Sequence, residues 1–306
     1  MLNLLMTLSE RNTFFKIGVS FCAVCVLLIL AASFLIIPLY QEGFYDNEIN
    51  KEPLSEIEQP YQKTDPDLTA GIPRPASYFQ SITSRILDNY YLAVHVSIIV
   101  IVLFSLIGML LIHYYFERTS APEIMYISIF IVSLSFEVIR LILPLQHIFI
   151  FSSFYVLITY RLLLFARFFG IFSLFTASIC AAGLEIQKTR NVIFIIVIAA
   201  LLITFSVPID VLNWDTSLNI VNGYVSIFRM IELSAFITIM IGFLIASNIQ
   251  ESKEYVYVAV GSMLVMIGRN ILIHTDNWIG PGPGIIMLSF GTWFLCSKLH
   301  KIHLWL

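Results

Sequence analysis

Eight windows of predominantly apolar residues constrain this chain more than any other feature of its sequence. A helix that spans a bilayer needs about 20 such residues. The windows lie at residues 14–40, 90–116, 124–144, 154–184, 192–207, 224–248, 255–274 and 284–304. They predict an all-α polytopic membrane protein with eight transmembrane helices, of which the first is a signal anchor and the other seven form a bundle.

Composition excludes several classes of protein. The chain is 58% hydrophobic and 12% charged, whereas soluble domains are about 25% charged. Its 17 Lys and Arg residues are scattered among the apolar windows, which excludes a nucleic-acid-binding surface. All four cysteines also lie in apolar windows, so we expect packing residues rather than disulfides, and neither they nor the histidines have metal-site spacing. We therefore expect no metal and no cofactor.

The polar segments divide the chain into three parts. Residues 1–40 form a short amino terminus and an anchor helix, which is longer than the roughly 7–15-residue core of a cleaved signal peptide. Residues 41–89 form a proline-rich segment outside the cytoplasm, and residues 90–306 form the seven-helix bundle. Each cytoplasmic joint is short, so we expect no cytoplasmic catalytic domain and an output that needs a partner protein.

Basic residues predict how the helices are oriented. Alternate joints and the two ends of the chain carry Arg11, Lys16, Arg118, Lys188, Arg190, Lys253, Lys298 and Lys301. The opposite short joints, around His147, 210–222 and 276–282, contain no Lys or Arg. The positive-inside rule then places both termini in the cytoplasm and the protein in the cytoplasmic (inner) membrane. In the last of the outer joints, the Gly-Pro-Gly-Pro-Gly run at 280–284 predicts a rigid turn.

Seven charged residues lie inside the predicted spans. They are Glu137, Arg140, Arg161, Arg167, Arg229, Glu232 and Arg269. Each such charge costs roughly 2.5–3.5 kcal/mol at the bilayer centre on insertion scales, so it faces the bundle interior and is a functional candidate by default. Counting along each helix from its predicted end places most of these charges in the outer half of the membrane.

Two interpretations of these charges are open. In the structural one, Glu137 pairs with Arg140 and Arg229 pairs with Glu232, since residues three apart share a helix face. Arg161 and Arg269 then extend their charged ends outward to the membrane interface.

In the functional interpretation, the surplus arginines line an outward-facing pocket for an anion, because guanidinium binds carboxylate or phosphate with two hydrogen bonds. Arg140, Arg161, Arg229 and Arg269 would hold the anion, and Glu137 and Glu232 would orient them. His95 and His274, near the outer ends of their helices, are further candidate ligand contacts, whereas Arg167 is assigned to packing.

An anchor helix, an outer segment and seven spans resemble the bacterial seven-transmembrane sensor modules of receptors with diverse intracellular outputs. The resemblance covers residues 90–306 and rests on this layout and on short polar joints such as Phe116-Glu117-Arg118-Thr119-Ser120-Ala121-Pro122-Glu123. It implies a non-enzymatic membrane sensor or accessory subunit. Its partners would be membrane lipid, an anionic small molecule or lipid headgroup, and another membrane or cytoplasmic protein for output.

Two other functions stay open at this point. The chain is an integral membrane enzyme or transporter for anionic lipid-linked substrates if Glu137 or Glu232 acts as a proton acceptor. It is a structural subunit of a membrane complex if the charges only fix helix packing.

Overall fold

The structure, a computed structural model, describes residues 8–41, 90–116, 122–146, 149, 151–183, 189–223 and 225–305. The predicted outer segment therefore lies almost entirely outside the described residues, as do Arg118 and Lys188.

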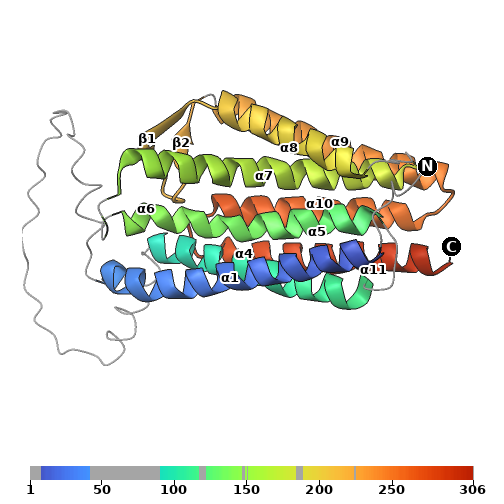
Figure 1. Ribbon diagram of the computed structural model, residues 1–306, viewed down its shortest axis with the longest axis horizontal. Helices are drawn as coiled ribbons and strands as arrows, with labels where there is room; N and C mark the ends of the chain where they lie inside the picture. Colours follow the sequence, from blue (N-terminus) through green and yellow to red (C-terminus); the bar gives the residue numbers. More distant parts are fainter. Residues whose placement is uncertain are drawn as a thin grey trace, which may run out of the picture.

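The described residues of the eight apolar windows are helical, apart from Ala182, Gly183 and Val207. The helices are α1 (Leu8–Gln41), α4 (Tyr90–Phe116), α5 (Pro122–Leu134), η1 (Ser135–Leu141), α6 (Ile142–Leu145), α7 (Ser153–Ala181), α8 (Thr189–Ser206), α9 (Val225–Ile249), α10 (Glu254–His274) and α11 (Pro281–Trp305). Elements α5, η1 and α6 follow one another as a single rod, and the rods run back and forth along the long axis of the molecule (Figure 1). Helix α1 begins and α11 ends at the same end of the bundle.

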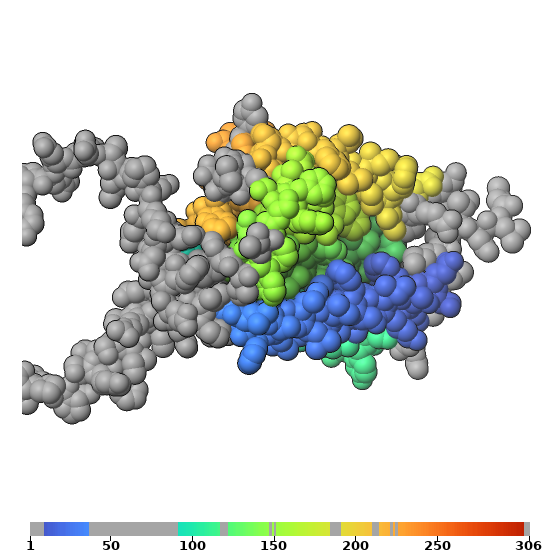
Figure 2. Space-filling view, turned by 60° about the vertical axis from the view of Figure 1, so that its left-hand side comes forward, coloured from blue at the N-terminus to red at the C-terminus, as the bar shows by residue number. Residues whose placement is uncertain are grey.

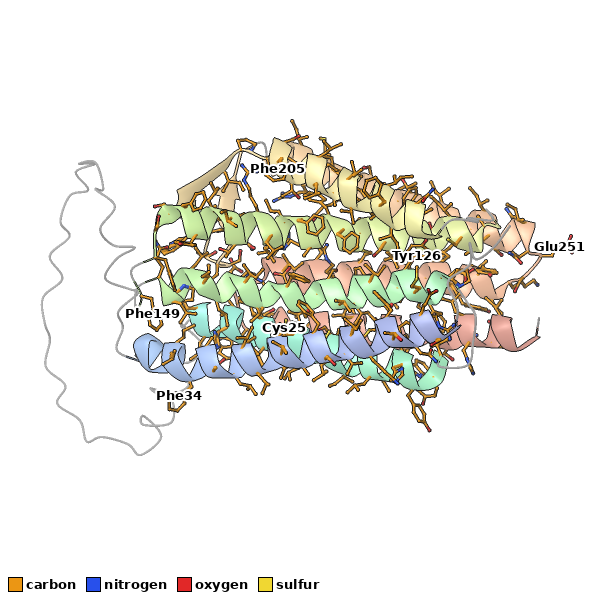
Figure 3. All side chains as sticks on the ribbon, viewed as in Figure 1. Cys25, Phe34, Tyr126, Phe149, Phe205 and Glu251 are labelled. Carbon is orange, nitrogen blue, oxygen red and sulfur yellow. The ribbon has the colours of Figure 1, made fainter. Side chains whose placement is uncertain are left out.

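Six of these rods are long and apolar enough to cross a membrane, so the chain is a helical multi-pass membrane protein. These six are α1, α4, the rod that starts with α5, α7, α9 and α10. Helix α8 contributes a shorter apolar stretch, Asn191–Ser206. Large apolar side chains such as Phe34 and Phe205 point away from the bundle (Figure 3). A surface of this kind suits contact with lipid.

Helices α10 and α11 form the closest pair in the bundle. A Cβ atom on Gly268 would lie 2.6 Å from the backbone nitrogen of Leu288 and 2.8 Å from the carbonyl oxygen of Gly284. Small residues let helix backbones approach closely, which drives association in lipid. The 280–284 run is therefore not a plain turn: Pro281 begins α11, and Gly284 already packs against Leu272.

Helices α8 and α9 lie at the edge of the bundle, against α7. Helix α9 packs on α7 and α10, and it is the least buried of the six long candidate spans. Figure 2 shows α8 (yellow) on the flank opposite to α1 (blue), with α7 (green) between them.

The joint between α8 and α9 is a β-hairpin, which the all-α prediction missed. Strands β1 (Ile209–Trp214) and β2 (Ile220–Asn222) pair antiparallel with an irregular register. The tip is closed by a hydrogen bond from the backbone nitrogen of Leu218 to the carbonyl oxygen of Asp215, with Leu218 in the left-handed region at φ 55°. Ser217, Leu218 and Asn219 are buried, so the tip is inserted among the helices.

Candidate functional site

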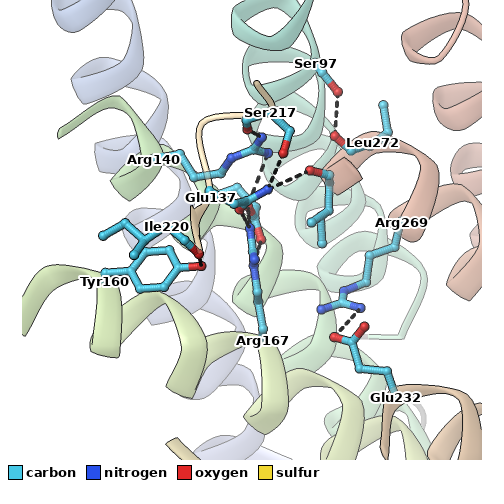
Figure 4. Close-up of polar contacts among 12 residues, drawn as sticks. Ser97, Glu137, Arg140, Tyr160, Arg167, Ser217, Ile220, Glu232, Arg269 and Leu272 are labelled. Carbon is cyan, nitrogen blue, oxygen red and sulfur yellow. Dashed lines mark hydrogen bonds and ion pairs between the residues drawn. The ribbon is translucent and has the colours of Figure 1, made fainter. Parts of the chain in front are cut away.

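Glu137 is the centre of a buried polar network. It lies on η1, where the α5 rod tightens into a 3₁₀ helix, and its side chain is 2% exposed. Arg167 of α7 donates to both carboxylate oxygens, from Nε and from Nη2, at 2.7 Å each (Figure 4). This two-bond geometry is the strongest that a guanidinium makes with a carboxylate.

Arg140, one turn from Glu137 on η1, ties the network to the hairpin. Its Nη2 donates to the carbonyl oxygen of Ser217 at the hairpin tip, and its Nη1 lies 3.6 Å from Glu137. The predicted pair of Glu137 and Arg140 therefore exists, but Arg167 is the closer partner. The assignment of Arg167 to packing was wrong, because its guanidinium neutralises the buried carboxylate.

Side-chain hydrogen bonds hold the rest of the hairpin tip in place. Asn219 accepts from Arg167 Nη2 at 2.8 Å and donates to the carbonyl oxygen of Ile273 on α10 at 3.2 Å. The hydroxyl of Tyr160 donates to the carbonyl oxygen of Ile220 at 3.0 Å. The network thus binds the rod α5–η1–α6, α7 and α10 to one inserted loop, which is a structural role.

A second, looser ion pair lies between α9 and α10. Arg269 Nη1 lies 3.9 Å from Glu232 Oε1, with side chains that are 4% and 26% exposed. Among the described residues, the buried Nη2 of Arg269 has no hydrogen-bond partner. The predicted pair of Arg229 with Glu232 was wrong: Glu232 turns to α10, and Arg229 has no ion pair within the described part of the chain.

A cavity of about 580 Å³ opens beside this second pair. Its wall comes mainly from α7, α9 and α10, and it has the size of typical small-molecule pockets. The charged residues on the wall are Arg167, Arg229, Glu232 and Arg269, joined by Asn270 and His274. Because Glu137 neutralises Arg167 from behind, the wall keeps one more arginine than it has carboxylates. The cavity is therefore suited to a negative group.

Two of the candidate ligand residues lie elsewhere. Arg161 donates to the carbonyl oxygen of Thr204 at 2.9 Å and lies over the ring of Phe205, so it faces α8. His95 faces α1, where its Nε2 lies 2.8 Å from the hydroxyl of Ser33. Neither belongs to the cavity wall. The expected convergence of four arginines thus reduces to Arg229 and Arg269 at the cavity, with Arg140 behind the hairpin.

Sequence reasoning missed Arg167, Asn219 and Tyr160. A usable signal existed for Arg167, since it continues a stripe of residues three or four apart on α7 that is buried throughout: Leu163, Gly170, Leu174, Ala177 and Ala181. Glycine and alanine along such a stripe indicate a face packed against another helix. No comparable signal marks Asn219, because its role depends on where the hairpin tip lies.

No group of three His, Cys, Asp or Glu side chains that would suit a metal ion occurs within the described ranges. No family model and no solved structure matches the chain. The chain is similar to an uncharacterized protein of Treponema pallidum (strain Nichols), with 20% identity over 239 residues, which is 62% of this chain and 69% of that protein. This likeness assigns no activity.

Proposed function

We propose that this protein is a sensor or accessory subunit of the cytoplasmic membrane that binds an anionic ligand in the cavity between α7, α9 and α10. The eight helical rods all cross the bilayer in this arrangement, with both termini in the cytoplasm. The ligand's negative group lies against Arg269 and Arg229, and Glu232 holds Arg269 in position.

The orientation is supported by the distribution of basic residues. Lys298 and Lys301 pair with Glu254 at 3.0 and 2.6 Å, where α10 begins and α11 ends. Lys16 lies near the start of α1, at the same end of the bundle. The hairpin and the charged wall of the cavity lie toward the opposite end. A basic end facing the cytoplasm agrees with the positive-inside rule.

The single observation that carries the proposal is that Arg269 lines the cavity and lacks a full set of hydrogen-bond partners among the described residues. A buried guanidinium needs hydrogen-bond acceptors for its N–H groups. A buried donor without an acceptor costs about 1–3 kcal/mol, and a charged donor costs more. Arg269 has one carboxylate at 3.9 Å and one nitrogen without a partner in the described residues. An anion in the cavity adds a hydrogen-bond acceptor for the Arg269 guanidinium and balances the charge of Arg229.

The test is anion-dependent stabilisation of the purified protein in phosphatidylcholine nanodiscs. A ligand that binds the folded state raises the unfolding midpoint Tm with concentration. Ethyl phosphate raises Tm in the natural protein and in Lys253→Gln, which removes a positive charge at the far end. It does not raise Tm in Arg269→Gln or Arg229→Gln. Equal Tm shifts in all four proteins contradict the proposal.

A second candidate, an enzyme or transporter that moves a proton, is supported by the position of Glu232. This carboxylate lies on the cavity wall, and among the described residues its one ion pair is the 3.9 Å contact with Arg269. Glu137 is unsuited to that role because Arg167 occupies both of its oxygens. In proteoliposomes, anion-driven proton movement that Glu232→Gln abolishes supports this candidate, and anion binding without it supports the sensor.

A further inference from the structure

The cavity is polar at one end and apolar at the other. Helix α9 leaves the hairpin and α10 returns to it, so Arg229 and Arg269 lie toward the hairpin. Phe236 and Met266 line the same cavity farther from the hairpin, whereas Phe168 of α7 lies against Phe228 near the polar end, with ring centroids 6.3 Å apart. Phe236 comes seven positions after Arg229, which is about 10 Å along the helix at 1.5 Å per residue. A small water-soluble anion makes no favourable contact with this apolar end.

Helix α9 separates the cavity from the surrounding lipid. Its neighbours are α7 and α10, and its outer face carries the exposed apolar residues Ile227, Met230 and Ile237. Leu233 lines the cavity and is also 57% exposed, so the wall is thin at that point. An opening beside α9 leads to the acyl region of the bilayer rather than to water.

We infer that the ligand of this cavity is an anionic membrane amphiphile, with a phosphate or carboxylate headgroup at Arg269 and Arg229 and an acyl chain along Phe236 and Met266. The inference rests on the proposed function and names the ligand class of that same site. The amphiphile enters sideways from the bilayer past Leu233. Charge selects the headgroup, and the apolar end selects the chain.

The direct test is photo-crosslinking in phosphatidylcholine nanodiscs with dodecyl phosphate that carries a diazirine in the middle of its chain. Label is expected at residues 233–236 of α9 or 266–267 of α10, and excess unlabelled dodecyl phosphate competes for it. Arg269→Gln reduces this label about tenfold, as expected for the loss of a hydrogen bond to a charged group. Label confined to the outward residues Ile227 and Met230, insensitive to Arg269→Gln, overturns the inference.

A filled cavity gives a second measurement. Phe236→Trp enlarges a side chain at the apolar end, and the matched control Ile237→Trp enlarges its neighbour on the lipid face. Phe236→Trp is expected to lower the Tm shift caused by dodecyl phosphate and to leave the Tm shift caused by ethyl phosphate unchanged. Ile237→Trp is expected to change neither Tm shift. If Phe236→Trp does not fold, Met266→Phe fills the same end.

The two levels of the proposal fail in different ways. If ethyl and dodecyl phosphate both bind through Arg269 but the acyl chain of the probe labels no cavity residue, the proposed anion site is retained and the inference of an amphiphilic ligand is wrong. If neither probe depends on Arg269, the anion site itself is wrong.

Discussion

Glu137 and Glu232 allow one substitution to be compared in two environments. Glu137 is 2% exposed and accepts two 2.7 Å bonds from Arg167, whereas Glu232 is 26% exposed and meets Arg269 only at 3.9 Å. In Glu137→Gln, the buried charges of Arg167 and Arg140 lose their carboxylate, and the amide NH₂ faces a guanidinium donor. Breaking a buried pair in this way costs about 3–5 kcal/mol. Glu232→Gln loses a partly exposed pair, which is worth about 0–1 kcal/mol.

The assay is the free energy of unfolding, titrated in mixed micelles with a denaturing detergent. Glu137→Gln is expected to lower it by about 3 kcal/mol or more and Glu232→Gln by about 1 kcal/mol or less. Adding Arg167→Gln to Glu137→Gln recovers part of the loss, because one unpaired charge leaves the interior. Equal losses for the two single variants, or no recovery in the double variant, refute the assignment of Glu137 to a structural network.

Three further predictions test the fold, the first of them with a control substitution. Gly268→Ala forces α10 and α11 apart and lowers the free energy of unfolding by about 1–3 kcal/mol. In the control Gly282→Ala, the added Cβ atom meets nothing within 4 Å, so the free energy of unfolding is unchanged or higher. Similar losses for both variants contradict the close contact. Asn219→Ala removes one of the two acceptors of Arg167 Nη2, so amide hydrogen exchange of residues 209–222 should speed up. Unchanged exchange shows that the hairpin tip is held without the Asn219 side chain. Glu251, exposed with φ 51°, is strained, so Glu251→Gly should raise the free energy of unfolding by about 0.5–1 kcal/mol, and a decrease contradicts the strain.

The helices could be predicted from sequence because long apolar windows leave a chain in lipid few alternatives. The hairpin could not. Residues 209–222 are short, mixed in polarity and preceded by Pro208, which predicts an ordinary joint. What decides their structure is the burial of Ser217 to Asn219 against Arg140 and Arg167, and no local pattern encodes that contact.

The same limit applies to the charges. Spacing along one helix puts Arg161 and Arg167, six residues apart, on different sides of α7, and they contact different helices. It gave no means of choosing which one faces inward, and the choice of Arg161 was wrong. Glu137 and Arg167 are 30 residues apart in the chain, so their pairing depends on how α7 packs on the α5 rod. Helix-face arguments favour neighbours three or four apart and miss such partners.

The 30-residue separation of Glu137 and Arg167 also bears on biosynthesis. The carboxylate is made first, and it reaches the membrane insertion machinery before its guanidinium partner on α7 has left the ribosome. Arg140 lies 3.6 Å away on the same rod, but the partner that makes two hydrogen bonds to the carboxylate comes only with α7, and it reduces the penalty of a charge in lipid. We therefore expect the α5 rod to wait at the insertion site and to leave it together with α7. The hairpin tip must wait longer, until α10 supplies the Ile273 carbonyl that receives Asn219.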